Sequence, residues 1–272
     1  MPELPEVETI ARRLEPHLRG EIIDEAQVFW PRTLAFPDLD AFKKRIRGQE
    51  IQRLSRRGKF LLLHLSTDTL LIHLRMSGDL LLKEGKIQPE KHDRLILTLT
   101  ALHPPQTTAL VFTDARKFGR VWLTAEPQQI LGRLGPEPFD AMFTAAWLST
   151  ALASKQRQIK PLLLDQTFIA GLGNIYADEA LHLAGIHPLT PAHHIPARRV
   201  AALWSAIRSV LEEGIRRNGA SIDWVYRGGE FQNHFRVYGR TGEACLTCGT
   251  PIQRILIGQR SSHFCPFCQP RE

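Results

Sequence analysis

The hydrophobic pattern of the chain changes near Leu134–Phe139, and this change constrains the fold more than any other feature of the sequence. Between about 21 and 125, short apolar runs recur, and several alternate with polar residues, as in Phe60–His64 and Arg94–Leu99. Such runs predict half-buried antiparallel strands. Beyond the Pro- and Gly-containing Leu134–Phe139 segment, apolar residues follow helical spacing, most clearly at 197–217. We therefore expect an α+β chain: an N-terminal antiparallel β-sandwich with flanking helices, then a helical part.

The charge of the chain favours a polyanionic partner. The 272 residues carry a net charge of +7, and they are enough for two domains. Nucleic acid is the first candidate for such a partner, and an anionic membrane surface is the second. No run approaches the roughly 20 apolar residues that span a bilayer, and the acidic N-terminus lacks the apolar core of a signal peptide. We expect a cytoplasmic protein with no membrane partner.

All four cysteines cluster near the C-terminus, in the pattern Cys-x2-Cys, sixteen residues, Cys-x2-Cys. In a reducing compartment this spacing favours a metal site over disulfides. Four thiolates fit a tetrahedral structural zinc ion, which would hold structure and not activate water. The segment 251–262, with Gly258 near its middle, predicts a β-hairpin between the two cysteine pairs. The predicted ligands of one zinc ion are Cys245, Cys248, Cys265 and Cys268.

The first nine residues, Met1–Thr9, contain two prolines and three glutamates, and they begin a helix predicted over 3–19. One interpretation is an acidic first turn that suits the positive end of the helix dipole. The other requires removal of Met1, which would give Pro2 a free secondary amine. An amine beside carboxylates is a nucleophile beside proton shuttles. Glu3 and Glu6, three apart, share a helix face.

Glycine and basic residues mark three further segments. Gly171–Asn174 precedes a helix, where Asn is a favoured N-cap and free N–H groups suit a phosphate; a plain capped turn is the alternative. Arg53–Phe60 contains four cations before a strand, and Lys59 is the candidate for phosphate contact if this is more than a solvated turn. In Asp114–Gly119, an aromatic next to an arginine could enter a base stack, although most such turns do not.

Two residues inside or next to the apolar runs have simpler default interpretations. His73 lies within a β-run, where a histidine is by default a satisfied residue of the core or sheet face. Met76 follows Arg75 at the end of a strand and would by default belong to the core.

Taken together and in order, these motifs closely resemble the bacterial formamidopyrimidine-DNA glycosylases. The resemblance runs from residue 2 to residue 269 and rests on the N-terminal Met-Pro-Glu-Leu-Pro-Glu-Val-Glu, Arg-Arg-Gly-Lys-Phe, His-Leu-Arg-Met-Ser-Gly, Asp-Ala-Arg-Lys-Phe-Gly, Gly-Leu-Gly-Asn-Ile-Tyr-Ala-Asp-Glu and the four-cysteine ribbon. It implies a bifunctional enzyme of base excision repair. Such an enzyme removes oxidised purines, among them 8-oxoguanine and formamidopyrimidines, through a Schiff base on the N-terminal proline and cleaves the strand by β,δ-elimination.

The resemblance also implies roles for individual residues. Pro2 would be the nucleophile, with Glu3 and Lys59 as further catalytic residues and Glu6 supporting the terminus. Proton donors would be Glu3, Lys59 and Arg260. The implied DNA contacts are His73, Met76, Arg116, Phe118, Lys160, Asn174 and Arg260. The loop at 220–242 is where the family varies and where lesion choice is partly decided.

From the resemblance we expect four segments: a catalytic sandwich over 1–133, a linker over 134–140, a helix-two-turn-helix domain over 141–242 and a zinc finger over 243–272. We expect a monomer that binds double-stranded DNA containing an oxidised purine or an abasic site. Its location would be the bacterial cytoplasm, at the nucleoid when bound to DNA.

Two alternatives remain open at this stage. A non-enzymatic zinc-ribbon DNA-binding protein explains the charge and the cysteines, but gives no reason for the Pro-led acidic terminus. The endonuclease VIII relatives prefer oxidised pyrimidines and typically begin Met-Pro-Glu-Gly, so Leu4 favours the purine enzyme.

Overall fold

The computed structural model describes residues 1–100, 108–221, 226 and 228–271. Contacts divide the chain into two units. The first is formed by Met1–Arg133 with Ser221–Gly228, and the second by Leu134–Ala220 with Gly229–Glu272. The first unit contains the two larger sheets and the second contains most of the helices, as the alternating and helical hydrophobic patterns predict.

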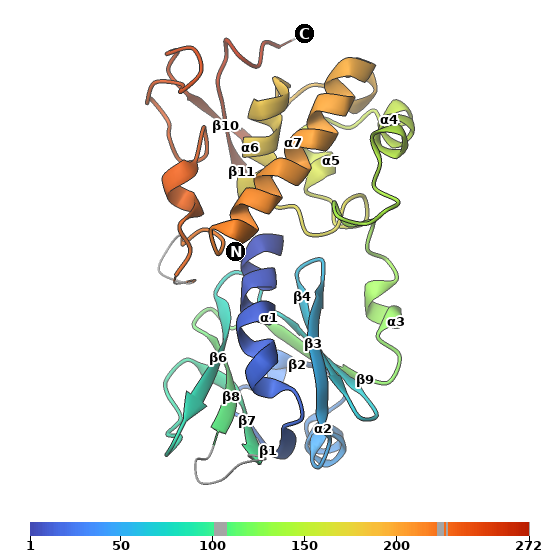
Figure 1. Ribbon diagram of the computed structural model, residues 1–272, viewed down its shortest axis with the longest axis vertical. Helices are drawn as coiled ribbons and strands as arrows, with labels where there is room; N and C mark the ends of the chain where they lie inside the picture. The colour runs from blue at the N-terminus through green and yellow to red at the C-terminus, as the bar shows by residue number, and fades with distance from the viewer. Residues whose placement is uncertain (101–107, 222–225, 227, 272) are drawn as a thin grey trace. The chain divides into compact units, whose positions relative to one another are not determined.

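The first unit begins with a helix and continues mainly as strands (Figure 1). Its elements are α1 (Leu4–Leu18), β1 (Ile22–Val28), η1 (Pro31–Thr33), β2 (Leu34–Phe36), α2 (Leu39–Ile46), β3 (Ile51–Arg57), β4 (Phe60–Leu65), β5 (Thr69–His73), β6 (Gly78–Glu84), β7 (Asp93–Thr100), β8 (Thr108–Asp114), β9 (Arg120–Thr124) and α3 (Gln128–Leu131).

These strands form two sheets that share one apolar core. One sheet has the order β1-β7-β8-β6 and the other β2-β9-β5-β4-β3. The pairings are antiparallel except for β2 with β9, which is parallel and departs from the fully antiparallel sandwich that we expected. In β7, Leu95 and Leu97 face the shared core whereas Ile96 joins a small cluster on the other face. This alternation is the period of two that identified the strands in the sequence.

Helix α1 packs against β3, β4 and β6, and therefore against the edge strands of both sheets. Its buried stripe includes Val7, Ile10 and Leu14, each of which contributes about 1.5–3 kcal/mol on full burial. Pro16 lies within the last turn, and the helix ends two residues later at Leu18.

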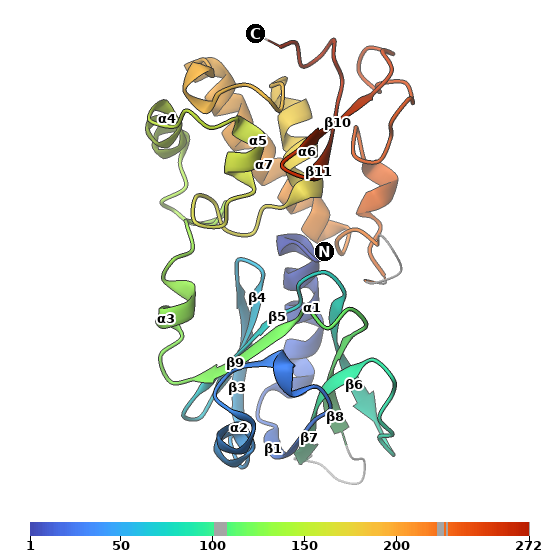
Figure 2. The ribbon, with the colours of Figure 1, turned by 180° about the vertical axis from the view of Figure 1, so that it is seen from behind.

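The second unit consists of helices and a C-terminal hairpin. Its elements are α4 (Ala145–Ala153), α5 (Ile159–Leu163), α6 (Asn174–Ala184), η2 (Ala192–His194), α7 (Ala197–Arg216), η3 (Phe231–His234), β10 (Gln253–Ile257) and β11 (Arg260–Phe264). Helix α7 packs on α4 and α6, and α6 also contacts α5 and β11 (Figure 2). The hairpin confirms the one predicted between the cysteine pairs, with its turn at Gly258 and Gln259.

Several local expectations need correction. The basic run at Arg53 belongs to strand β3, because Ser55 and its neighbours pair with β4 up to the turn at Gly58. Helix α4 starts at Ala145, because the Thr144 side chain accepts the N–H of Trp147 and caps the helix.

The segment 220–242, expected to be an unstructured loop, lies partly outside the described residues, which omit 222–225 and 227. Its later part contains the 3₁₀ helix η3 (Phe231–His234). Phe231 is buried and stacks on Tyr176 of α6 with ring centroids 5.0 Å apart.

Among the described residues, none of the helices combines the length and the hydropathy that crossing a membrane requires.

Candidate functional site

The N-terminus of α1 is a buried acidic turn. Pro2, Glu3 and Glu6 are all buried, and Glu3 is the N-cap residue. The Glu3 N–H donates to Glu6 Oε2 at 2.7 Å. This hydrogen bond satisfies one of the donors that a helix start leaves unpaired, and the dipole of α1 favours the carboxylates there. Glu6 therefore holds the backbone directly after Pro2, whose nitrogen is an amide nitrogen as long as Met1 is attached.

Glu8, to which the sequence assigned no role, ties α1 to strand β3. Its carboxylate accepts from Arg56 Nε at 2.6 Å and from Arg12 Nε at 2.5 Å. Burial raises the pKa of Glu8, but the guanidinium groups of Arg56 and Arg12 lower it by a larger amount. The pKa of Glu8 therefore lies below its usual value. Because Arg56 lies three residues before Lys59, this ion pair fixes the strand that leads to Lys59 onto the helix that carries Glu3.

Lys59 lies in the turn between β3 and β4 and is only 4% exposed. The next residue, Phe60, pairs with His73 of β5, and their rings meet edge to face at 4.8 Å. His73 Nδ1 accepts the N–H of Arg75 at 3.0 Å. Burial, and then the charges of Arg75 and Lys59, lower the pKa of His73 to about 3. His73 is therefore a neutral imidazole near a buried lysine.

Asp114 organises the turn that follows β8. It is buried, and its carboxylate accepts from the Ser77 hydroxyl, from the Arg116 N–H at 3.1 Å and from the Gly119 N–H at 2.7 Å. The segment after β5 and the turn at 115–119 are thus joined through one side chain. The sequence contains a signal for this arrangement, because an aspartate before a turn commonly accepts from the backbone beyond it.

The tips of these two segments expose the residues that the resemblance selected. Met76 is 39% and Phe118 50% exposed, and the Arg116 guanidinium lies 5.2 Å from the centroid of the Phe118 ring. Met76 is therefore not the core residue that its place at a strand end suggested by default. Arg75 and Lys117, next to these residues, adopt positive φ angles of 55° and 61°. Left-handed backbone at non-glycine residues is uncommon and gathers at functional sites.

In the second unit, Lys160 does not lie at the surface. It is 1% exposed, and its ammonium donates to Asp178 of α6 and, at 3.2 Å, to Ser262 Oγ of β11. Asp178 also accepts the Ser262 hydroxyl at 2.9 Å and the His263 N–H at 3.0 Å. In this arrangement Lys160 holds α5, α6 and β11 together, a role that was not visible in the sequence.

Asn174 also differs from its expected place. Helix α6 begins at Asn174 itself, Gly173 is the N-cap residue, and the Asn174 Nδ2 donates to Ser261 O at 3.0 Å. Its Oδ1 is buried with no hydrogen-bond partner among the described residues. Asn174 and Lys160 therefore contact adjacent residues of β11, directly after the exposed Arg260. The structure brings these three predicted phosphate contacts to one strand.

The four cysteines form a metal site. Their Sγ atoms lie within 4.8 Å of one another, with 3.9 Å between Cys245 and Cys268 and 3.4 Å between Cys248 and Cys265. Ligands at the Zn–S distance of about 2.3 Å around a tetrahedral ion are about 3.8 Å apart, so the sulfur atoms fit one zinc ion. None of the four forms a disulfide.

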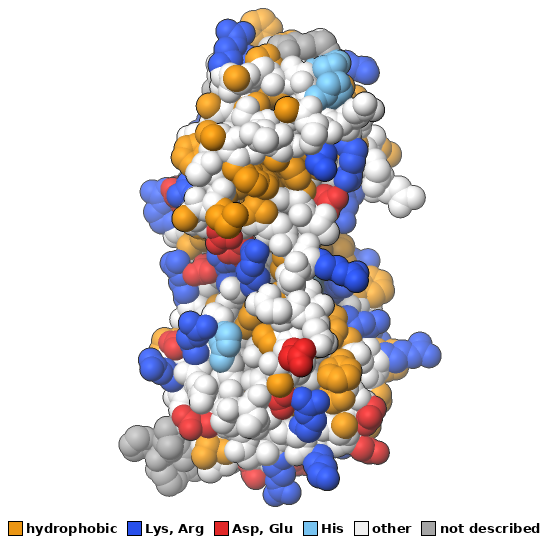
Figure 3. Space-filling model, turned by 90° about the vertical axis from the view of Figure 1, so that its right-hand side faces the viewer, with side chains coloured by type: hydrophobic (Ala, Val, Ile, Leu, Met, Phe, Trp, Pro, Cys, Tyr) orange, Lys and Arg blue, Asp and Glu red, His pale blue; other side chains and the backbone are white. Residues whose placement is uncertain are grey.

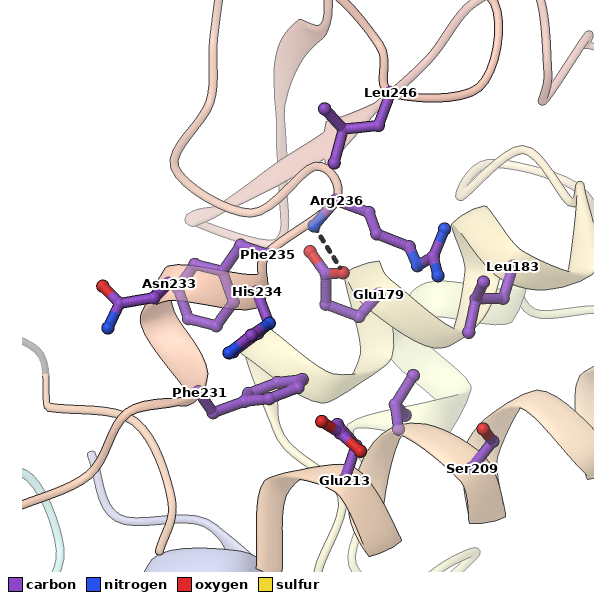
Figure 4. A pocket seen from close by; sticks show the side chains of 11 residues that line it. Glu179, Leu183, Ser209, Glu213, Phe231, Asn233, His234, Phe235, Arg236 and Leu246 are labelled. Carbon is purple, nitrogen blue, oxygen red and sulfur yellow. Dashed lines mark hydrogen bonds between the residues drawn. The ribbon is translucent and has the colours of Figure 1, made fainter. Parts of the chain in front are cut away.

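A surface pocket of about 400 Å³ lies beside this ribbon, between α6, α7 and the segment around η3 (Figure 4). Glu179 borders it, and its carboxylate accepts the backbone N–H groups of Arg236, Val237 and Tyr238 at 2.8–3.0 Å. Burial raises the pKa of Glu179, although these three hydrogen bonds oppose the shift. Glu179 therefore anchors the chain that enters the zinc ribbon.

On the face shown in Figure 3, Lys and Arg side chains are interspersed with acidic and apolar ones. The cations selected from the sequence are distributed accordingly, since Lys59 and Arg116 lie in the first unit and Lys160 and Arg260 in the second.

Three family models match successive parts of the chain. The formamidopyrimidine-DNA glycosylase N-terminal domain matches residues 1–121 and the H2TH domain of the same enzymes matches 134–225. The zinc finger found in FPG and IleRS matches residues 242–271. These three matches, in this order, define the class of DNA glycosylases with an H2TH domain and a zinc finger.

Curated relatives cover nearly the whole chain. The formamidopyrimidine-DNA glycosylase of Desulforamulus reducens is 44% identical over 99% of both chains. That of Chloroflexus aurantiacus is 47% identical over 99% of this chain and 98% of its own. The chain therefore belongs to the formamidopyrimidine-DNA glycosylase family.

Solved structures of the family agree with this fold. Lactococcus lactis Fpg in complex with DNA containing an abasic site is 37% identical, with a TM-score of 0.91 over 99% of this chain and 100% of that one. A complex of the same enzyme with DNA containing an oxidised pyrimidine matches with the same TM-score of 0.91.

Proposed function

We propose that this protein is a bifunctional DNA glycosylase and abasic-site lyase of base excision repair. It removes oxidised purines from double-stranded DNA, among them 8-oxoguanine and formamidopyrimidines, and then cleaves the strand. Membership of the glycosylase family, shown by relatives at 42–47% identity, supports the reaction class. Solved relatives bound to DNA with an abasic site or an N7-benzyl-Fapy-dG lesion support the substrate class.

The observation that carries the proposal is the buried turn at Pro2, Glu3 and Glu6. Once Met1 is removed, Pro2 offers a secondary amine at the start of α1, beside the N-cap carboxyl of Glu3. The nitrogen forms a bond to C1′ of the damaged nucleotide while the N-glycosidic bond breaks, and the base leaves with a proton. The C1′–O4′ bond then breaks, O4′ takes the proton that the proline nitrogen gives up, and the ring-opened sugar is left as an iminium of Pro2. The iminium is cationic, so it acidifies the neighbouring C2′ of the sugar.

Elimination then completes the reaction. Loss of a proton from C2′ of the iminium expels the 3′ phosphate, and a second elimination expels the 5′ phosphate. We assign the proton transfers to Glu3, Lys59 and Arg260, and the support of the terminus to Glu6. The buried Lys59, on a turn tied to α1 through Arg56 and Glu8, suits a group that needs a defined position.

The remaining assigned residues bind DNA. A base must leave the duplex before it can react, at a cost of a few kcal/mol, and side chains that fill the gap offset this cost. The exposed Met76 and Phe118, with Arg116 over the Phe118 ring, suit that role. His73, Lys160, Asn174 and Arg260 are assigned to the DNA strand itself, Lys160 by holding β11 in place. One structural zinc ion on the four cysteines keeps Arg260 and its hairpin ordered.

For the whole chain we propose a monomer with a catalytic part at 1–133, a linker at 134–140, a DNA-binding part at 141–242 and a zinc finger at 243–272. We place it in the bacterial cytoplasm, at the nucleoid when bound to DNA. The bacterial sources of the relatives and the need for reduced thiolates support this location.

Borohydride trapping tests the nucleophile. A duplex containing 8-oxoguanine opposite cytosine should form a covalent adduct with the mature chain, and Pro2→Gly should lose most of it. Pro5→Ala, which changes the other proline of the same turn, is the matched control and should trap normally. A chain with a residue left in front of Pro2 should form no adduct. Equal trapping by that chain would show that another group is the nucleophile.

The same assay separates the two alternatives. A non-enzymatic DNA-binding protein would give neither adduct nor nick. A pyrimidine-selective enzyme would excise thymine glycol faster than 8-oxoguanine, and the relative solved with oxidised-pyrimidine DNA makes this comparison necessary. We expect faster excision of 8-oxoguanine.

A further inference from the structure

His182 on helix α6 reaches the zinc site without being one of its ligands. The side chain is 5% exposed, and its Nε2 lies 3.5 Å from the Sγ of Cys245. The four sulfur atoms already supply a full tetrahedral set, since all lie within 4.8 Å of one another. The imidazole therefore stands next to a metal ligand, in the position of a hydrogen-bond partner.

The rest of the ring indicates which atom carries the proton. His182 Nδ1 is buried and has no hydrogen-bond partner among the described residues. A neutral imidazole has one donor and one acceptor, and a zinc-bound thiolate can only accept. The tautomer with hydrogen on Nε2 is the one that places its donor against the sulfur and leaves only an acceptor unmatched. Burying the ring with Nε2 unprotonated would instead leave both its donor and the sulfur unmatched, at about 1–3 kcal/mol for each.

The surroundings of the Cys245 sulfur favour such a hydrogen-bond donor. Four thiolates and Zn²⁺ together carry two negative charges, and Cys245 is buried whereas Cys248 is exposed to solvent. A buried thiolate cannot spread its charge into water and depends on donors from the protein. The N–H of Thr247, at 3.4 Å, is one such donor, and it comes from the same knuckle as Cys245. His182 adds a donor from a different element.

We propose that His182 is a positioning residue of the zinc site: its Nε2–H donates to the Cys245 thiolate, joins helix α6 to the ribbon and protects this ligand from electrophiles. Partners around a metal's direct ligands orient those ligands and commonly change metal affinity 10- to 100-fold. A hydrogen-bond donor lowers the basicity of a thiolate, and the intrinsic nucleophilicity of the thiolate falls with its basicity. The proposal concerns zinc retention alone and holds whether or not the chain cleaves DNA.

Two substitutions in the zinc-loaded full chain separate the hydrogen bond from simple packing. His182→Phe keeps a flat ring but removes the donor, whereas His182→Gln can place an amide N–H where Nε2 stood. His187→Phe is the control, because His187 is a buried histidine of the same unit that hydrogen-bonds the Leu189 N–H and no cysteine.

Zinc release is followed with a coloured zinc chelator, with and without N-ethylmaleimide. We expect His182→Phe to lose roughly tenfold in zinc affinity and to release zinc correspondingly faster on alkylation, with His182→Gln and His187→Phe near the wild type. Equal release from all chains would overturn the proposal. Equally fast release from both His182 variants would overturn it too, since packing and not the donor would then be responsible.

Two measurements on the unmodified sequence do not depend on how the variants fold. Nitrogen NMR of the zinc-loaded chain should show His182 with hydrogen on Nε2 and a bare Nδ1, and the opposite tautomer would exclude the donor role. The cobalt-substituted chain should show charge-transfer absorption of four thiolates. A spectrum of three thiolates and one nitrogen would make His182 a ligand and contradict the proposal.

Discussion

Two β-hairpins of this molecule carry a cation at the turn, and they are stabilised by different means. The hairpin of β3 and β4 places Lys59 in its turn and belongs to a five-stranded sheet over a large apolar core. The hairpin of β10 and β11 places Arg260 directly after its turn and forms a two-stranded sheet alone. Among the residues that the structure describes, the cluster of buried apolar residues beside it is small and consists of Val237, Ile252, Cys245 and Cys265, with Cys268 packed against it.

An isolated two-stranded hairpin is marginal in water, so the second one needs other support. It has the zinc site at one end and polar side chains of α6 along its length: Asp178 binds Ser262 and the His263 N–H. Similar local geometry therefore depends on buried apolar area in the first hairpin and on a metal site and hydrogen bonds in the second. The two hairpins should therefore fail under different treatments.

Zinc removal should produce the largest difference between the hairpins. Structural zinc contributes roughly 10–16 kcal/mol in isolated fingers, so amide protection in β10 and β11 should fall at least about 100-fold while that of β3 and β4 stays unchanged. Hydrogen exchange with mass spectrometry, with zinc loss verified, measures both in one sample. DNA affinity should weaken in parallel. Unchanged protection in β10 and β11 would show that the polar contacts suffice alone.

Removing the carboxylate of Asp178 should have the next largest effect. Asp178→Ala leaves the buried ammonium of Lys160 without its ion-pair partner, which typically costs about 3–5 kcal/mol. Glu243→Ala, at an ion pair whose carboxylate is mostly exposed, is the control and should cost less than about 1 kcal/mol. Urea unfolding midpoints decide between them. Similar values for both would mean that the buried network adds no stability to β11.

The smallest effect should come from acid. Lowering the pH should destabilise the fold through His73, which pairs with Phe60 of the first hairpin. Its pKa is about 3 in the folded chain and about 6.5 when unfolded, so the unfolded state binds the extra proton between these values. The contribution of His73 to the free energy of unfolding is therefore complete above pH 6.5 and decreases as the pH is lowered towards 3. The loss is about 0.8 kcal/mol at pH 6 and about 2 kcal/mol at pH 5.

His73→Phe keeps an aromatic edge against Phe60 and removes the titrating group. The variant should therefore show a flatter dependence of unfolding free energy on pH between 5 and 7 than the unmodified chain. His193→Phe, at an exposed histidine, is the matched control. Parallel slopes for all three chains would show that His73 gains its proton as easily folded as unfolded.

The elements with a clear hydrophobic period could be predicted from the sequence. The strands around Leu95 and Leu110, helix α7 and the ribbon hairpin all carry either a period of two, a helical stripe or fixed cysteine spacing. The zinc site was also predictable, since its ligands lie in two short motifs. These signals are local, and each can be read without knowing what packs against it.

The contacts that organise the candidate site could not be predicted from the local sequence. Lys160 was expected only as a DNA contact, from the resemblance; its ion-pair partner Asp178 lies in another helix, and nothing local in the sequence shows that both are buried. Asn174 resembled an N-cap because propensity favours it there, yet its side chain bonds to β11 instead. Tertiary hydrogen bonds between distant segments decided both positions. His182 was not predicted for the same reason, since its sulfur partner is 63 residues away.

The single carboxylate of Asp114 has a consequence for how the exposed tips can act. It accepts from the hydroxyl of Ser77, the residue after Met76, and from the backbone of the turn that carries Arg116 and Phe118, so both tips are tied to the same side chain. Ordering a mobile segment on binding costs about 0.5–1.5 kcal/mol of free energy for each side chain that is immobilised. Here the backbone under the tips is already ordered by folding, and any surface that meets them encounters a preformed shape.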